Sequence, residues 1–159
     1  MQRQDVEDGK VKEQPGSMKR RVLVVDEDLD DLLYYTDVLQ HQGYQVRSIF
    51  SYAAGAACVE REDFDLIVVS QGSPSFEGRL VSARAIERNR STPVLVLTRA
   101  VEMPCYIEAM QSGARDYVEK PLPPSDIGQL VEKYLPTRSA SPRSQREARA
   151  ASTLALPAR

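Results

Sequence analysis

The sequence predicts an α/β fold in which five parallel strands form one doubly wound sheet, a (βα)5 arrangement within a single domain over residues 19–136. Three observations predict this fold. Short, almost wholly apolar runs recur along the chain, as expected for strands buried on both faces. Amphipathic helical patterns separate these runs. Gly and Pro lie at several of the junctions. A chain of 159 residues with 42% hydrophobic content is long enough to bury such a core.

The first predicted strand covers residues 21–25 and ends in three acidic residues, Asp26, Glu27 and Asp28. A helix is predicted over 29–42, because apolar residues recur there at helical spacing. Acidic residues in its first turn suit the positive end of the helix dipole. Gly43 is expected to follow the end of this helix.

The remaining elements alternate in the same way. The other predicted strands cover residues 44–49, 64–69, 93–97 and 115–118. The other predicted helices cover residues 52–61, 79–90, 102–112 and 125–134. In the helix over 79–90 we expect Leu80, Ala83 and either Ala85 or Ile86 to face the core. Ser125 is expected to cap the last helix.

The two ends of the chain differ from the core in composition. Residues 1–18 contain few apolar side chains and are predicted to be a disordered extension, with Met18 an alternative start. Residues 137–159 hold five arginines and one acidic residue and are predicted to be a disordered basic tail. The tail is either a solvated end or a docking arm for an acidic partner. Residues 19–136 hold 13 basic and 18 acidic residues, a net charge of −5.

Composition also excludes several classes of protein. Two cysteines are too few for a disulfide scaffold. No apolar run approaches the ~18 residues of a membrane span, so we expect no membrane partner. The first residues do not form a signal peptide, which favours the cytoplasm. A net charge of −2 and the lack of Trp give no reason to expect nucleic-acid binding.

Polar side chains follow four of the predicted strands directly. Acidic residues follow the first strand, Ser70 the third, Thr98 and Arg99 the fourth, and Lys120 the fifth. The carboxyl ends of parallel strands meet at one edge of a sheet, where the binding crevice of such folds lies. We therefore expect these side chains to form one site.

Several motifs in this pattern are similar to those of a known family. They are Val24-Val-Asp-Glu-Asp28, Asp65-Leu-Ile-Val-Val-Ser70, Pro74 and Gly78, Pro93-Val-Leu-Val-Leu-Thr98, and Gly113-Ala-Arg-Asp-Tyr-Val-Glu-Lys-Pro121. Together they resemble the flavodoxin-like receiver domain of two-component response regulators over residues 19–136.

The resemblance implies a role for each site residue. Asp26 and Glu27, with the backbone carbonyl of Gly72, correspond to the residues that hold Mg²⁺. An Asp at the end of the third strand takes a phosphoryl group from a histidine kinase, and Thr98 and Lys120 correspond to the residues that contact this group. Tyr117 corresponds to an aromatic residue that changes rotamer on activation; the alternative is that it is simply a packed core residue.

The phosphoacceptor position is the main departure, because Ser70 stands there in place of Asp. The five preceding residues and the spacing to Pro74 and Gly78 fix this alignment. A hydroxyl must lose its proton to a general base during attack, and its phosphate ester would not be a labile acyl phosphate. The single histidine, His41, lies at the far end of its helix, which leaves Asp26 or Glu27 as the remaining candidate bases. A protein kinase acting on Ser70 is a further alternative.

Arg99 is a second departure, because the family commonly has a small residue there. We expect Arg99 either to pair with Asp26, Glu27 or Asp28, and with Lys120 to neutralise the pocket, or to point into solvent. No metal is expected to bind firmly. Mg²⁺ would bind weakly, if at all, through Asp26, Glu27 and Gly72.

The sequence thus predicts a stand-alone atypical receiver that has no catalytic residue and signals by protein contact, through the last two helices and last strand, about residues 102–135. A histidine kinase or a second copy of the chain is an alternative partner. The 23 residues after Pro136 are too few for a DNA-binding fold. One alternative is a phosphorelay component that still accepts phosphate. Another is an enzyme on the same fold, although the chain has neither a phosphate-binding glycine loop after the first strand nor a nucleophile–histidine pair.

Overall fold

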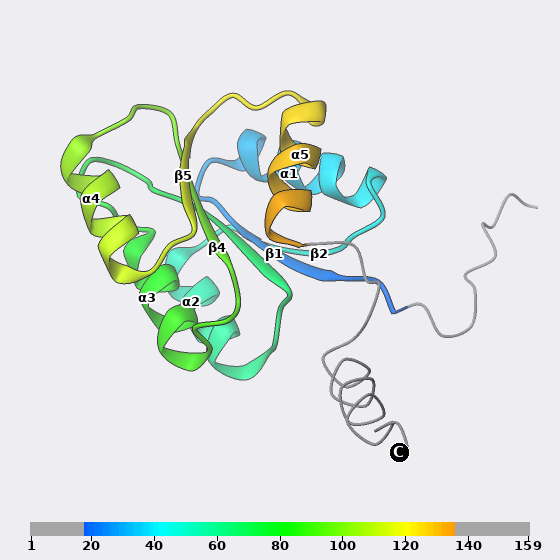
Figure 1. The fold of residues 1–159 in the computed structure, drawn as a ribbon, viewed down its shortest axis with the longest axis horizontal. Helices are drawn as coiled ribbons and strands as arrows, with labels where there is room; N and C mark the ends of the chain where they lie inside the picture. Colours follow the sequence, from blue (N-terminus) through cyan, green and yellow to red (C-terminus); the bar gives the residue numbers. More distant parts are fainter. Residues whose placement is uncertain (1–17, 136–159) are drawn as a thin grey trace, which may run out of the picture.

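A computed structural model describes residues 18–135, where five parallel strands alternate with five helices (Figure 1). The sheet has the order β2-β1-β3-β4-β5. The strands are β1 (Arg21–Val25), β2 (Gln45–Ile49), β3 (Leu66–Ser70), β4 (Val94–Thr98) and β5 (Asp116–Glu119). The helices are α1 (Leu29–His41), α2 (Tyr52–Arg61), α3 (Arg79–Arg88), α4 (Met103–Ser112) and α5 (Pro124–Tyr134). The predicted doubly wound (βα)5 fold is confirmed.

The three central strands are the most apolar because both of their faces are covered. Every residue of β3 and β4 is buried, and β1 is exposed only in part at its first residue. The edge strand β2 is mostly exposed or half-buried and carries Gln45, Arg47 and Ser48. Parallel pairing of β1 with both β2 and β3 brings the carboxyl ends of the central strands to one edge.

Alternate residues of each strand enter two separate cores. Leu23 and Val25 pack with α2, α3 and α4 on one face, whereas Val22 and Val24 pack with α1 and α5 on the other. Figure 1 shows the same two layers of helices, with α4, α3 and α2 on one side of the sheet and α1 and α5 on the other. The loops at the carboxyl edge of the sheet therefore lie between two packed layers of helices.

Helix α1 begins at Leu29 as predicted and ends at His41, one residue before its predicted end. The side chain of Asp28 caps the helix by accepting a hydrogen bond from the amide of Asp31 at 3.1 Å. Gly43 follows the helix in the left-handed region with a φ of 94°, a conformation that favours glycine. Helix α1 thus starts at the carboxyl edge of the sheet with its positive end facing the acidic residues there.

Two local expectations are wrong. Ser125 does not cap α5, because the helix already begins at Pro124, and the fixed φ of proline suits this first helical position. The residue before it is Pro123, and no side chain caps the helix. The inward face of α3 consists of Val81, Ser82 and Ala85. Ala85 therefore faces the core as predicted, whereas Leu80 and Ala83 are exposed. Several of the other predicted boundaries differ from the observed ones by one or two residues.

The predicted extension over 1–18, apart from Met18, and the predicted tail over 137–159 lie outside the described residues. Within residues 18–135, no helix is both long enough and apolar enough to cross a bilayer.

Candidate functional site

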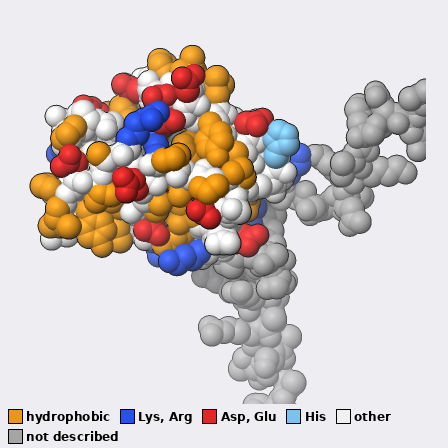
Figure 2. Space-filling model, turned by 90° about the horizontal axis from the view of Figure 1, so that it is seen from above, with side chains coloured by type: hydrophobic (Ala, Val, Ile, Leu, Met, Phe, Trp, Pro, Cys, Tyr) orange, Lys and Arg blue, Asp and Glu red, His pale blue; other side chains and the backbone are white. Residues whose placement is uncertain are grey.

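A pocket of about 390 Å³ opens at the carboxyl edge of the sheet. It is lined by Asp26, Glu27, Asp28, Tyr52, Ser70, Gly72, Ser73, Glu77, Arg99 and Lys120. Seven of these residues were predicted for the site from the strand ends or from the family resemblance. Figure 2 views the molecule from above, and a basic group lies among acidic and hydrophobic side chains on that face.

Lys120 is the central cation of the pocket. Its Nζ lies 2.6 Å from Asp26 Oδ2, 2.9 Å from Asp31 Oδ2 and 3.2 Å from Ser70 Oγ. Its side chain is 4% exposed, and that of Asp26 is 5% exposed. An ammonium group has three donors, and these three oxygens use all of them. Lys120 therefore ties the ends of β1, β3 and β5 to the first turn of α1.

Ser70 ends β3 and is buried. Burial raises the pKa of the neighbouring Tyr52 hydroxyl to about 12, and the Ser70 side chain lowers that pKa only in part. His41 lies in the last turn of α1, about 20 Å from the pocket end of this 13-residue helix. Ser70 thus accepts a hydrogen bond from Lys120 and lies beside Tyr52, and the histidine is out of reach.

Arg99 reaches across the rim of the pocket to α1. It forms ion pairs with Asp28 at 3.0 Å and with Asp31 at 2.8 Å, and its side chain is 64% exposed. Asp28 is one of the predicted partners of Arg99, and this pairing is confirmed. The second partner is Asp31, which was not predicted, and Arg99 forms no ion pair with Asp26 or Glu27. The carboxylate of Asp31 raises the pKa of Arg99. The pKa of Asp28 is lowered mainly by the hydrogen bond from the Asp31 amide and further by the positive charge of Arg99.

Asp31 is a site residue that the sequence analysis missed. It was assigned only to the helix dipole, yet its Oδ2 bridges Lys120 and Arg99. The available signal was its position three residues after the cap Asp28, which directs it to the same side of the first turn. Asp28, Arg99, Asp31, Lys120 and Asp26 form one continuous charge network.

The other side of the pocket is acidic. Glu27 Oε2 accepts a hydrogen bond from the amide of Tyr52 at 3.2 Å. Glu77, also missed from the sequence, accepts one from the amide of Ser73 at 2.7 Å, and a bond with the Ser73 side chain lowers the pKa of Glu77. Gly72 has a φ of 84°, and a Cβ there would lie 2.4 Å from Glu77 Oε2. Within residues 18–135, no three His, Cys, Asp or Glu side chains are grouped so that they could hold a metal ion.

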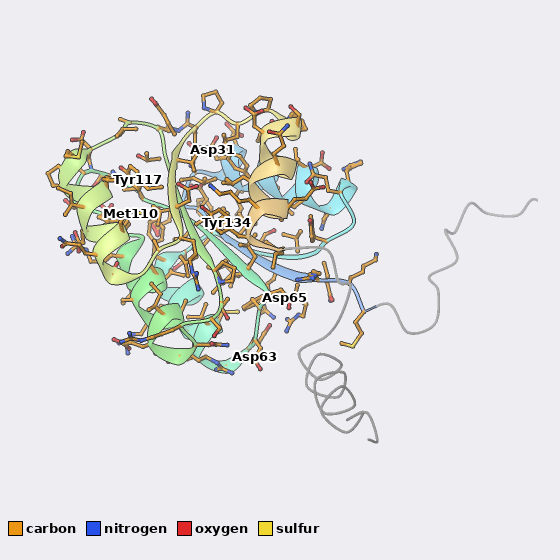
Figure 3. All side chains as sticks on the ribbon, in the orientation of Figure 1. Asp31, Asp63, Asp65, Met110, Tyr117 and Tyr134 are labelled. Carbon is orange, nitrogen blue, oxygen red and sulfur yellow. The ribbon has the colours of Figure 1, made fainter. Side chains whose placement is uncertain are left out.

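Thr98 and Tyr117 do not line this pocket. Thr98 is buried and donates its hydroxyl to the carbonyl of Ala100 at 2.7 Å. Tyr117 is buried and donates its hydroxyl to Oε1 of Gln71, the residue after Ser70. Figure 3 shows Tyr117 between β5 and α4, while Asp31 lies near the β1 end of α1. Gln71 is a further residue that the sequence analysis missed.

Comparison with known proteins agrees with this architecture. The response regulator receiver domain family matches residues 22–132. The sensor protein GacS of Pseudomonas syringae pv. syringae is 32% identical over 80% of this chain and 15% of its own length. The regulatory protein VanRc of Enterococcus gallinarum is 30% identical over 74% of this chain and 51% of its own length. The chain thus spans about half or less of these relatives.

Solved structures show the same fold. A CheY-like receiver domain protein from Methanospirillum hungatei JF-1 superposes with a TM-score of 0.70, at 24% identity, over 74% of this chain and 94% of that one. The response regulator DrrB of Thermotoga maritima superposes with a TM-score of 0.64, at 25% identity, over 74% of this chain and 53% of that one. With the family match over residues 22–132, these findings establish that the chain belongs to the response regulator receiver domain family of two-component signalling.

Proposed function

We propose that this chain is an atypical receiver that acts by protein–protein contact without aspartyl phosphorylation. The observation that carries the proposal is the residue at the end of β3. There the neutral hydroxyl of Ser70 lies 3.2 Å from Lys120 Nζ. We propose that Ser70 stands where other members of the family carry the phosphoacceptor carboxylate.

The hydrogen bonds around Ser70 support this proposal. A hydroxyl nucleophile needs an acceptor for its proton. Lys120 instead donates to Ser70 Oγ at 3.2 Å. The Tyr52 hydroxyl is a poor base, because burial raises its pKa to about 12 and it therefore keeps its proton. Asp26, the nearest carboxylate along the network, already accepts hydrogen bonds from Lys120 and from the amide of Asp28. Ser70 therefore has no evident general base among the groups that contact it.

The same contacts argue against firm binding of Mg²⁺. The ion prefers hard oxygen ligands in near-octahedral geometry. Asp26 uses both of its oxygens within the protein, at 2.6 and 2.9 Å, and Glu27 accepts from the amide of Tyr52. We propose that the ammonium of Lys120 occupies the electrostatic role of the metal. Asp26, Glu27 and Gly72 do not fit the ion in this arrangement.

The proposed contact surface consists of α4, β5 and α5. Its α4 side exposes a row of hydrophobic side chains: Val101, Met103, Tyr106, Ile107 and Met110. Met103, Tyr106, Ile107 and Met110 recur at the spacing of one helix face, and exposed hydrophobic side chains gathered in this way are typical of a protein-binding surface. We propose a protein partner for it, with a second copy of the chain or a histidine kinase as alternative occupants.

Intact mass tests the chemical half of the proposal. The full chain is incubated with Mg²⁺ and a small-molecule phosphodonor, and the Ser70→Asp variant is treated in parallel. The proposal expects no phosphoryl adduct on the wild-type chain. An adduct that maps to Ser70, or to a neighbouring acidic residue, would instead support a phosphorelay component.

Charge insertion tests the contact surface. Ile107→Asp places a carboxylate in the middle of the apolar row and should abolish capture of partner proteins, or self-association if the partner is a second copy. Leu33→Asp on α1 is the matched control, because Leu33 is similarly exposed but lies on another helix. Equal effects of the two variants would contradict the assignment of this surface.

A further inference from the structure

We infer that Gln71 is a positioning residue that holds Tyr117 inward and thereby presets the surface formed by α4, β5 and α5. This inference rests on the proposed function of that surface. Gln71 directly follows Ser70 and is 2% exposed, which is unusual for an amide side chain in a core of this size. The role of Gln71 follows from what its two amide atoms contact.

Gln71 is itself fixed on several sides. Its backbone amide donates to the carbonyl of Leu97 at 2.7 Å, and its carbonyl accepts from the amide of Gly78 at 3.0 Å. Its side-chain Nε2 donates to the carbonyl of Ser73 at 3.2 Å. These contacts fix the orientation of the side-chain amide. Its oxygen, Oε1, accepts a hydrogen bond from the hydroxyl of Tyr117.

Tyr117 carries this constraint to α4. Its hydroxyl oxygen accepts a hydrogen bond at 3.3 Å from the amide of Glu102, the residue that precedes the first turn of α4. The ring of Tyr106, which is 41% exposed on α4, packs edge-on against the Tyr117 ring with centroids 5.7 Å apart. The inward position of Tyr117 thus fixes both the start of α4 and an aromatic side chain of the proposed surface.

Thr98 does not hold the Tyr117 hydroxyl in the present structure. Its hydroxyl donates to the carbonyl of Ala100, so the hydrogen-bond acceptor for Tyr117 comes from the residue after β3 and not from β4. A buried tyrosine hydroxyl requires a partner, and Gln71 supplies one in this structure. The position of Tyr117 is therefore set without a phosphoryl group or a metal ion.

Amide hydrogen exchange at Glu102 tests the inference, since that amide reports directly on the Tyr117 hydroxyl. Gln71→Met keeps the length of the side chain but removes the oxygen that accepts the hydrogen bond from Tyr117. We expect it to reduce protection of the Glu102 amide roughly fivefold, the value of about one lost hydrogen bond. Gln71→Glu retains an acceptor oxygen and should restore much of the protection.

Two further variants keep the result interpretable. Gln42→Met removes an exposed amide that donates to the carbonyl of Pro124 at 2.9 Å, and it should leave Glu102 unchanged. Tyr117→Phe should reduce protection as Gln71→Met does, and combining the two should cause no further loss. Unchanged Glu102 protection in Gln71→Met, or additive losses in the double variant, would overturn the inference. Because these readouts involve neither phosphate nor a partner, they are independent of the tests of the proposed function.

Discussion

Replacing Lys120 by Met should destabilise the domain more than any other single charge removal in the pocket. The substitution leaves Asp26, which is 5% exposed, without its cation at 2.6 Å. Removing one partner of a buried ion pair typically costs 3–5 kcal/mol. Asp26 keeps the amide of Asp28 at 2.9 Å, and Asp31 keeps Arg99 at 2.8 Å. We therefore expect a loss at the lower end, about 3 kcal/mol, a large share of the ~5–15 kcal/mol that stabilises a typical domain.

Urea unfolding followed by far-UV circular dichroism measures this loss, because the chain has no Trp for fluorescence. The m-value should stay constant while the midpoint falls. Lys133→Met, at an exposed position of α5, is the control and should change the free energy of unfolding by no more than ~0.5 kcal/mol. Adding Asp26→Asn to Lys120→Met should recover part of the loss. A change below ~1 kcal/mol for Lys120→Met would refute the conclusion that the buried carboxylate of Asp26 depends on Lys120 for its stabilisation.

Four other changes test the remaining parts of the account. Ser70→Asp places a carboxylate beside Lys120. This variant should bind Mg²⁺, as measured by calorimetry, and should form a phosphoryl adduct, as measured by intact mass. A variant that does neither would mean that Arg99 or Glu27 has also disabled the site. Arg99→Ala removes a cation from the rim and should raise Mg²⁺ affinity, and an unchanged titration would contradict this. The pKa of Asp28 is lowered in the folded state, so the ionised carboxylate of Asp28 stabilises the fold fully above its unfolded pKa near 3.8. This contribution is lost as the pH falls through the folded pKa. Asp28→Asn, which retains a capping oxygen, should therefore make the free energy of unfolding, measured by urea titration, depend less on pH on the acid side. Gly78→Ala would place a Cβ 2.0 Å from the Ser70 carbonyl oxygen and should cost about 1–3 kcal/mol in thermal unfolding, whereas Gly128→Ala, with its nearest contact 3.3 Å away, should not.

The fold could be predicted because the strands are buried on both faces. Continuous apolar runs such as Leu66 to Val69 have few other stable placements in a domain of this size. The site residues followed from the same topology, since parallel strands deliver Asp26, Ser70 and Lys120 to one edge whatever their rotamers.

The features that could not be predicted depend on side-chain direction. The α3 segment Arg79–Arg88 contains few apolar residues, so several helical faces fit the pattern equally well, and the observed inward face includes Ser82. Asp31 and Gln71 take part through the angles of their side chains, which the composition of a helix turn or a strand end does not specify. Sequence periodicity therefore located the pocket but not the network that neutralises it.

Amide chemical shifts of the full chain, recorded before and after addition of Mg²⁺ and beryllium fluoride, test the central claim most directly, because this mixture imitates a phosphoryl group on a receiver carboxylate. With Ser70 at the end of β3 and Lys120 already bonded to Asp26 and Asp31, we expect no shift at Glu102, Tyr117 or the β4–α4 loop. Saturable shifts at these amides in the wild-type chain would contradict the claim that the pocket works without phosphate.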